Sequence, residues 1–242
     1  MIDINNKKFN FYDPVNIVDI DNEDQIFSEI LYILSEKYIP TRENKMIMNQ
    51  FDNLVINHNN INEKKITSEK IFTGFEHLIS TDLISRLKQD QKGLSLLSSN
   101  FILLDINHKN DYKLISKVLE QILDLRIIPI ISHPERFEIL NKERIFALKD
   151  QGVLFQLSLG SFSSLFGEEI EKNSKYFLEI GVYDFIATDS INYDQMNNSF
   201  IENKIESIIQ IIGSKKLNEI FLDNPKNVTD QKSSNDFQIS RH

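Results

Sequence analysis

The 242-residue chain contains no cysteine and no tryptophan, and it has only seven glycines and five prolines. Without cysteine it cannot form disulfides, use a thiolate nucleophile or build a cysteine-ligated zinc site. It also lacks an excess of positive charge, because its formal net charge is −9, which argues against a nucleic-acid-binding face. No apolar run approaches the roughly 20 residues of a membrane span, and the N-terminus does not resemble a signal peptide. These absences predict a cytoplasmic protein without a membrane span.

Apolar residues make up 40% of the chain, which is enough for a packed core. From about residue 71 onward, short apolar runs alternate with amphipathic stretches, a pattern typical of an α/β protein with a parallel sheet or barrel. The expected strands are Ile71–Phe75, Phe101–Leu104, Ile127–Ser132, Val153–Leu157, Tyr183–Thr188 and Glu219–Leu222. The expected helices are Thr81–Lys88, Asp111–Leu125, Lys142–Asp150, Leu165–Ile180 and Ile201–Ile212.

The pattern before residue 71 is weaker, and the segment from Asn224 onward is polar. The N-terminal part predicts short strands at Met1–Ile4 and Tyr38–Ile39 and helices at Glu23–Lys37 and Met46–Ile56. No shift in composition marks a domain boundary. We therefore expect one domain over residues 1–224, followed by a polar C-terminal tail over residues 225–242.

Four expected strand ends carry a side chain that can bind a metal or transfer a proton: Glu76, Asp105, His133 and Asp189. Parallel α/β folds gather their chemistry at the carboxyl ends of strands. An unpaired charge directly after a buried strand costs several kcal/mol, so mutual use of the four groups around a cation would explain them together. Three carboxylates and an imidazole suit Mn, Fe or Mg, or else zinc. The alternative is that each group only caps the helix that follows.

The strand Ile127–Ser132 carries the most specific pattern, because it continues directly into His133-Pro134-Glu135-Arg136. An imidazole at the end of a buried strand, with a guanidinium three residues later, suits a catalytic site. The alternative is a capped strand end whose histidine and arginine only satisfy backbone groups. His77 and His108 lie near site strands, and we expect them to be solvated; the alternative is that one of them serves as a further ligand.

The segment Pro129–Arg136, which reads Pro-Ile-Ile-Ser-His-Pro-Glu-Arg, resembles a strand of the bacterial capsule-type tyrosine phosphatases of the PHP (polymerase and histidinol phosphatase) superfamily. Ala187–Asn192 is similar to the GSDAHN segment of that family, and Gly74–Glu76 to its GxE motif. Leu104-Asp105 is similar to its Ile-Glu pair, and Asn224-Pro225 to the Asn-Pro after its last strand. The resemblance covers most of the chain from about residue 70.

This resemblance implies a distorted (β/α)7 TIM-like barrel of the PHP type, whose rim holds up to three divalent metal ions, usually manganese. It implies hydrolysis of phosphotyrosine in proteins that regulate capsular or exopolysaccharide biosynthesis, with a bacterial tyrosine kinase of polysaccharide export as a possible partner. Carried over to this chain, Glu76, Asp105, His133 and Asp189 match metal ligands. Arg136 matches the arginine that holds the phosphate, so His133 and Arg136 are the expected catalytic residues.

The chain departs from the family pattern at four imidazoles. The opening His-x-His is replaced by Asn5 and Lys7, a later histidine by Arg42, and the histidine of the GSDAHN segment by Ile191. A charged lysine, an arginine and an isoleucine do not bind metal. Asp105 also replaces a longer glutamate, which shortens the reach of that ligand.

From these departures we expect at most one divalent ion, with manganese preferred, at Glu76, Asp105 and His133. The main hypothesis is a degenerate phosphatase with weak or no turnover that still binds a phosphorylated ligand. Lys7 and Arg42 would then join Arg136 in a phosphate-binding pocket; the alternative is that both are solvated surface residues. One alternative is an active single-metal phosphotyrosine phosphatase. Another is a non-catalytic scaffold in surface-polysaccharide assembly.

Overall fold

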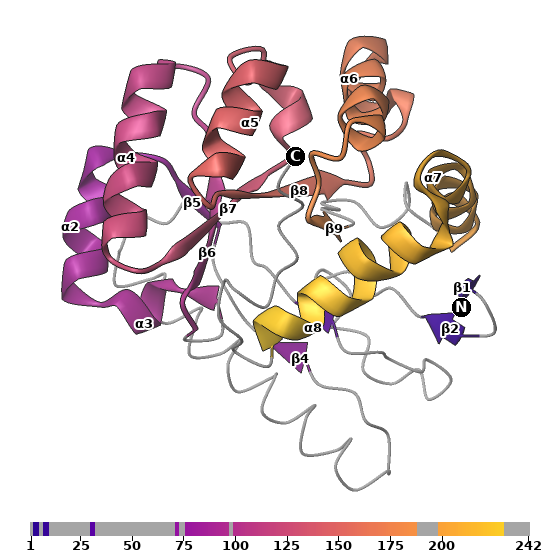
Figure 1. Cartoon of the computed structure of the whole chain (residues 1–242), viewed down its shortest axis with the longest axis horizontal. Helices are drawn as coiled ribbons and strands as arrows, with labels where there is room; N and C mark the ends of the chain where they lie inside the picture. Colours follow the sequence, from indigo (N-terminus) through magenta and orange to yellow (C-terminus); the bar gives the residue numbers. More distant parts are fainter. Residues whose placement is uncertain are drawn as a thin grey trace, which may run out of the picture.

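The computed structural model describes residues 2–4, 7–9, 30–31, 71–72, 76–96, 99–187 and 198–229 (Figure 1). At its centre lies a five-stranded parallel sheet whose strand order, β5-β6-β7-β8-β9, follows the order of the chain. The strands are β5 (Glu76–Leu78), β6 (Phe101–Asp105), β7 (Ile128–Ser132), β8 (Leu154–Ser158) and β9 (Phe185–Ala187). The expected α/β class with a parallel sheet is therefore confirmed.

The helices between the strands begin where the sequence provides a capping side chain. The side chains of Ser80, Asp111 and Asn141 each accept a hydrogen bond from the backbone N–H three residues later, which satisfies an otherwise unpaired donor of the first turn. The α-helices are α2 (Thr81–Gln89), α3 (Gln91–Leu94), α4 (Tyr112–Asp124), α5 (Lys142–Asp150), α6 (Glu168–Glu179), α7 (Asn198–Asn218) and α8 (Asn224–Thr229). Two 3₁₀ turns, η3 (Pro134–Arg136) and η4 (Ser164–Phe166), and one π-helical turn, η6 (Glu219–Asp223), complete these segments.

Alternate residues of the sheet pack into two separate apolar clusters. The strand residues of the cluster that faces the helices are Ile102, Leu104, Ile131, Phe155, Leu157 and Ile186. The strand residues of the cluster on the opposite face are Phe101, Leu103, Ile128, Ile130, Leu154 and Phe185. Burial on both faces explains why these strands read as continuous apolar runs. The strand order never reverses, so right-handed crossovers keep the connecting helices on one face of the sheet. The same arrangement occurs in barrels, and a closed barrel is part of the proposed function.

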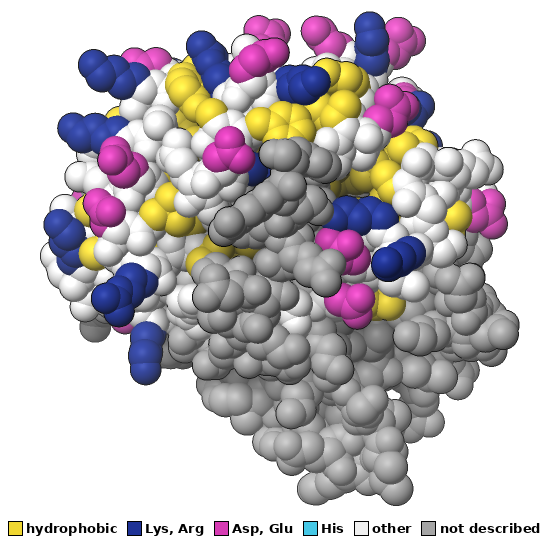
Figure 2. Space-filling model, in the orientation of Figure 1, with side chains coloured by type: hydrophobic (Ala, Val, Ile, Leu, Met, Phe, Trp, Pro, Cys, Tyr) yellow, Lys and Arg dark blue, Asp and Glu magenta, His cyan; other side chains and the backbone are white. Residues whose placement is uncertain are grey.

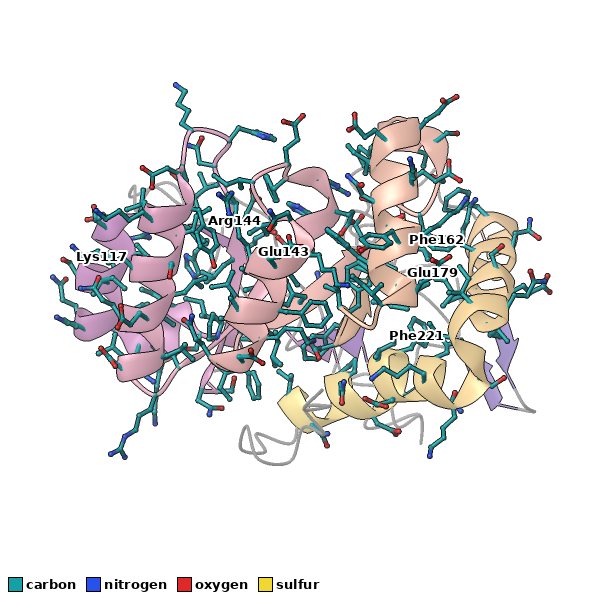
Figure 3. All side chains as sticks on the ribbon, turned by 45° about the horizontal axis from the view of Figure 1, so that its top comes forward. Lys117, Glu143, Arg144, Phe162, Glu179 and Phe221 are labelled. Carbon is teal, nitrogen blue, oxygen red and sulfur yellow. The ribbon has the colours of Figure 1, made fainter. Side chains whose placement is uncertain are left out.

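Helices α4 and α5 also contact each other through polar side chains. Arg144 of α5, labelled in Figure 3, places its guanidinium over the ring of Tyr112 in α4, 4.7 Å from the ring centroid. It also donates a hydrogen bond to the carbonyl of Ile139. On the face seen in Figure 2, acidic and basic side chains are interspersed over the helices. Within the described part of the chain, no helix is long and apolar enough to cross a membrane.

Two expectations for the N-terminal part are corrected. Ile30–Leu31 forms strand β3, which pairs in parallel with β4 (Ile71–Phe72), so the expected helix over Glu23–Lys37 is wrong at these two residues. Pairing with a distant strand overrides the helical spacing of the local apolar residues. Glu76 does not follow the strand at Ile71–Phe75, as expected, but begins β5 in the main sheet.

The remaining N-terminal expectations have mixed outcomes. The strand expected at Met1–Ile4 is present as β1 (Ile2–Ile4), which pairs antiparallel with β2 (Lys7–Phe9). The segments Tyr38–Ile39 and Met46–Ile56 lie outside the described residues.

The C-terminal end of the domain is helical where a strand was expected. Glu219–Leu222 is part of the π-helical turn η6, and helix α8 follows over Asn224–Thr229. The rest of the expected polar tail, residues 230–242, lies outside the described residues. A short apolar run does not distinguish a strand from a buried helical turn. Asn224 is buried, and its side chain donates a hydrogen bond of 2.8 Å to the carbonyl of Asp184, which ties this segment to the sheet.

Candidate metal and phosphate site

Three of the four expected metal ligands lie together at the carboxyl end of the sheet. Glu76 lies in β5, Asp105 ends β6, and His133 directly follows β7. One ligand atom from each lies within 4.8 Å of the other two. The Nε2 atom of His133 is 3.5 Å from Oε1 of Glu76 and 3.8 Å from Oδ1 of Asp105. Two carboxylates and one imidazole fit a single divalent ion of the Mn, Fe or Zn type.

The backbone at His133 has an unusual conformation that helps to form this site. Its φ of 34° and ψ of 53° lie in the left-handed region, which a side chain other than glycine rarely adopts. Such residues concentrate at functional sites, where the surrounding structure holds them in place. The turn leads directly into η3, so that Arg136 follows His133 within one turn.

Ser132, which the sequence analysis did not select, contacts two of the three candidate ligands through its hydroxyl. Its hydroxyl donates a hydrogen bond to Oε1 of Glu76 and lies 3.0 Å from the carbonyl of Leu104 and 3.2 Å from Nε2 of His133. Burial alone would raise the pKa of Glu76. The hydrogen bond and charge of His133 and the hydroxyl of Ser132 outweigh burial, so the pKa of Glu76 lies below its ordinary value and the carboxylate is ionised.

Arg136 is held at the same end of the sheet by two serines. Its Nε donates a hydrogen bond of 2.8 Å to the hydroxyl of Ser161, and one terminal nitrogen donates a bond of 2.6 Å to the hydroxyl of Ser158 at the end of β8. The guanidinium lies 4.0 Å from the centroid of the Phe166 ring. The positive charge of Arg136 also contributes to the lowered pKa of Glu76, which places the two side chains in the same electrostatic environment.

A further acidic residue, Glu135, lies beside this site and was also missed by the sequence analysis. Its side chain is buried, and its carboxylate accepts hydrogen bonds from the backbone N–H of Ser158 at 3.3 Å and from the hydroxyl of Tyr183 at 3.1 Å. Burial raises the pKa of Glu135, although its hydrogen bonds, including one with Ser161, oppose the shift. The only sequence signal was its place between His133 and Arg136.

Several expected site residues lie outside the described part of the chain or are described only in part. Arg42 and Asp189 lie outside the described residues, as do Asn5 and Ile191. Lys7 lies in strand β2, but only its backbone is described.

Of the two histidines near the site strands, His108 is exposed, as expected, whereas His77 is not. His77 is buried, and its Nε2 lies 2.8 Å from the carbonyl of Leu94, so the expectation is wrong for this residue. Burial lowers the pKa of His77. The ring of His108 lies 5.3 Å from the ring of Phe137, which in turn lies 5.5 Å from the ring of His133. His108 is therefore close to the site but is not one of the converging ligands.

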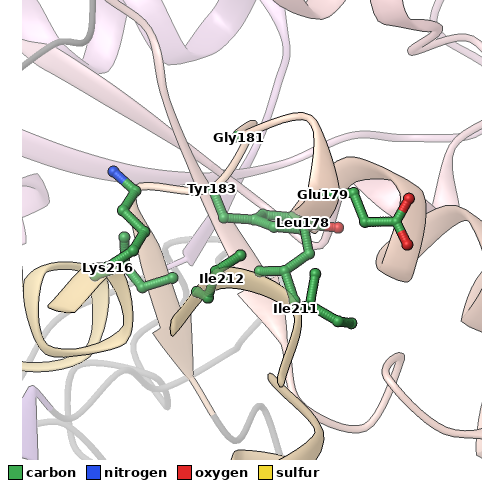
Figure 4. Close-up of a pocket in the computed structure, with 8 residues that line it drawn as sticks. Leu178, Glu179, Gly181, Tyr183, Ile211, Ile212 and Lys216 are labelled. Carbon is green, nitrogen blue, oxygen red and sulfur yellow. The ribbon is translucent and has the colours of Figure 1, made fainter. Parts of the chain in front are cut away.

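A separate hollow of about 250 Å³ lies between α6, α7 and η6 (Figure 4). Leu178, Ile211, Ile212 and Tyr183 contribute to its wall, and none of the three candidate ligands does. The ring of Tyr183 therefore borders this hollow, while its hydroxyl bonds to Glu135 on the site side.

The parallel sheet, with two carboxylates and an imidazole at its carboxyl end and a serine-held arginine beside them, fits a metal-binding α/β protein of the PHP superfamily. Comparison with known families agrees with this class. The family model described as "Capsular polysaccharide synthesis, CpsB/CapC" matches residues 5–230, and the chain belongs to this family.

Individual relatives support the same assignment. The chain is 30% identical to the tyrosine-protein phosphatase CpsB of Streptococcus pneumoniae over 162 residues, which cover 64% of this chain and 66% of that relative. It is 27% identical to CpsB of Streptococcus agalactiae over 173 residues, or 69% and 70% of the two chains. A crystal structure from a study of YwqE of Bacillus subtilis and CpsB of S. pneumoniae, described as unique metal-dependent tyrosine phosphatases, matches with a TM-score of 0.61. That match has 19% identity, covers 75% of this chain and 73% of the other, and supports the fold.

Proposed function

We propose that this chain binds phosphotyrosine in a protein of the capsule or exopolysaccharide system at a one-metal site, and that its turnover is weak or absent. The observation that carries the proposal is the convergence of Glu76, Asp105 and His133 within 4.8 Å at the end of the sheet where Arg136 is also held. The homologues named as tyrosine phosphatases give the ligand class. A tyrosine kinase of polysaccharide export, a cytoplasmic location and a closed barrel are parts of the same proposal.

The donor set fits one divalent ion, for which manganese is our choice. Such an ion would lower the pKa of a water molecule and polarise the phosphoryl group. Glu76 and Asp105 would bind it through carboxylate oxygens and His133 through Nε2. Arg136 would orient the phosphate, because a guanidinium binds phosphate through paired, charge-assisted hydrogen bonds. Asp189 is proposed to lie nearby.

Weak turnover is proposed because the chain has replaced the other imidazoles of the family. Two-metal hydrolases hold both the attacking and the leaving oxygen between their ions. With Asn5 and Lys7 at the opening positions and Ile191 at a later one, ligands for a second ion are missing. Lys7 and Arg42 would instead add positive charge to a phosphate-binding pocket.

Two measurements test this proposal. Elemental analysis of protein purified without chelator should give no more than one divalent metal per chain, and two or more would overturn the one-metal site. Hydrolysis of an aryl phosphate with added manganese should be absent or orders of magnitude below that of CpsB from S. pneumoniae, while calorimetry should still detect phosphotyrosine binding.

The intact triad and the ordered Arg136 favour a second candidate, an active single-metal phosphatase. Manganese-stimulated rates that match those of the relative, and that His133→Ala abolishes, would establish this candidate and overturn the proposal of weak turnover. If the protein neither binds nor hydrolyses phosphotyrosine, both candidates fail and a scaffold function stands.

A further inference from the structure

Glu135 is a buried acidic residue for which the proposed function has no role. It is 2% exposed, lies in the turn η3 between His133 and Arg136, and does not belong to the converging metal ligands. Burying a carboxylate is costly unless donors surround it. Here Ser158 and Tyr183 donate hydrogen bonds to it, and Ser161 is a third polar residue that lowers its pKa.

Two of these three residues also bind Arg136, which connects the buried carboxylate to the guanidinium. The hydroxyl of Ser161 accepts a hydrogen bond from Nε of Arg136, and Ser161 also lowers the pKa of Glu135. A hydroxyl has one proton and two lone pairs, so a Ser161 hydroxyl that accepts from Arg136 keeps its proton available for Glu135. Ser158 donates its backbone N–H to Glu135 and accepts from Arg136 through its hydroxyl.

The two serines therefore lie between an acidic and a basic side chain, and the carboxylate determines how they are oriented. Ser158 ends β8 and Ser161 lies in the segment that follows it. Without a carboxylate at Glu135, the Ser161 hydroxyl could rotate and the Ser158 backbone would lose an acceptor. Tyr183 fixes the carboxylate from the other side, through a bond to Oε2.

We infer that Glu135 is a positioning residue that orients the guanidinium of Arg136 through Ser158 and Ser161. The inference rests on the proposed function, because the aim of Arg136 matters only if Arg136 binds phosphate. It assigns Glu135 no contact with the ligand. A residue that only stabilises the fold would not change phosphate binding through Arg136, whereas a positioning residue should. This difference distinguishes the two roles of Glu135.

The first test measures phosphotyrosine affinity by calorimetry in a double-mutant cycle. Glu135→Gln retains the size of the side chain but replaces one acceptor oxygen with a donor, and Ser161→Ala breaks the connection from the other side. Each should weaken binding by about 10-fold, the magnitude of one charge-assisted hydrogen bond. In an Arg136→Ala background Glu135→Gln should have no further effect. Equal effects in both backgrounds, or none in either, would overturn the inference.

The second test does not depend on ligand binding. The Nε–Hε resonance of Arg136, assigned by its loss in Arg136→Lys, should be protected from solvent exchange in the wild-type protein. It should exchange faster in both Glu135→Gln and Ser161→Ala, and unchanged protection would overturn the inference. If the wild-type protein fails to bind phosphotyrosine while the resonance responds as expected, the proposed function fails and the orienting role of Glu135 stands.

Discussion

Removing the hydroxyl of Ser132 is the sharpest test of the candidate metal site, because this residue supports a ligand without being one. Ser132→Ala deletes the donor to Oε1 of Glu76 and leaves the three ligand side chains in place. Partners that orient metal ligands typically contribute 10-fold to 100-fold in metal affinity. We therefore expect the dissociation constant for Mn²⁺ to rise by about 10-fold to 100-fold, with the stoichiometry unchanged.

The same loss should appear in the stability that metal confers. When free metal is at 100 times the dissociation constant, binding stabilises the folded state by about 2.7 kcal/mol. At that metal concentration, the weakened site of Ser132→Ala would confer only about 1.4 to 0.4 kcal/mol. The metal-free variant should in addition be destabilised by about 1–3 kcal/mol, because the buried carboxylate of Glu76 loses a donor.

Calorimetric titration with Mn²⁺ and urea unfolding with and without Mn²⁺ measure both quantities. Ser95→Ala is the matched control, because Ser95 is also buried and its hydroxyl donates only to the carbonyl of Gln91 in α3. This control should lower stability slightly and leave metal affinity unchanged. If Ser132→Ala retains the wild-type affinity for Mn²⁺, the reasoning that places the ion at Glu76 is wrong.

Three further predictions concern other parts of the protein. Burial lowers the pKa of His77 below its ordinary value of 6.5, so the folded state binds fewer protons than the unfolded state. The free energy of unfolding should therefore fall as the pH drops below 6.5, by at most about 1.4 kcal/mol per pH unit. In urea unfolding, His77→Gln should lose this pH dependence. Lys149→Met should lower the free energy of unfolding by about 3–5 kcal/mol, because it leaves the partly buried carboxylate of Asp184 without its cation. A loss below about 1 kcal/mol in urea unfolding would contradict this prediction. Phe166→Ala removes the ring under Arg136 and should weaken phosphotyrosine binding in calorimetry by about 2-fold to 5-fold, whereas an unchanged affinity would show that the ring does not support the guanidinium.

The local rules of sequence interpretation succeed where one segment contains all the necessary information. The helix at Lys142–Asp150 has the predicted bounds, because the cap at Asn141 that begins it is a local feature. The same rules fail at Glu219–Asp223, where tertiary packing makes an apolar run helical. They also fail at Ile30–Leu31, whose partner strand lies about 40 residues away along the chain.

The residues of the candidate site also divide into those with a local sequence signal and those without one. Asp105 and His133 were found because each ends a buried apolar run, which is visible in the sequence. Ser132, Ser158 and Ser161 were missed, because a serine has a role here only through side chains that the fold brings to it. Sequence spacing places a residue on a strand, but it does not show which hydroxyl a distant arginine or glutamate will contact.

The register of the strands explains how a single-ion site is formed from three ligands at different heights. Glu76 pairs with Leu103, and Leu78 pairs with Asp105, so Glu76 starts two residues farther from the carboxyl end than Asp105 does. The Glu76 side chain is 9% exposed, whereas the Asp105 side chain is 30% exposed. The left-handed turn at His133 accompanies an imidazole whose Nε2 lies within 3.8 Å of an oxygen of each carboxylate. The shorter aspartate therefore reaches the site, and the argument for weak turnover depends on the replaced imidazoles and not on Asp105.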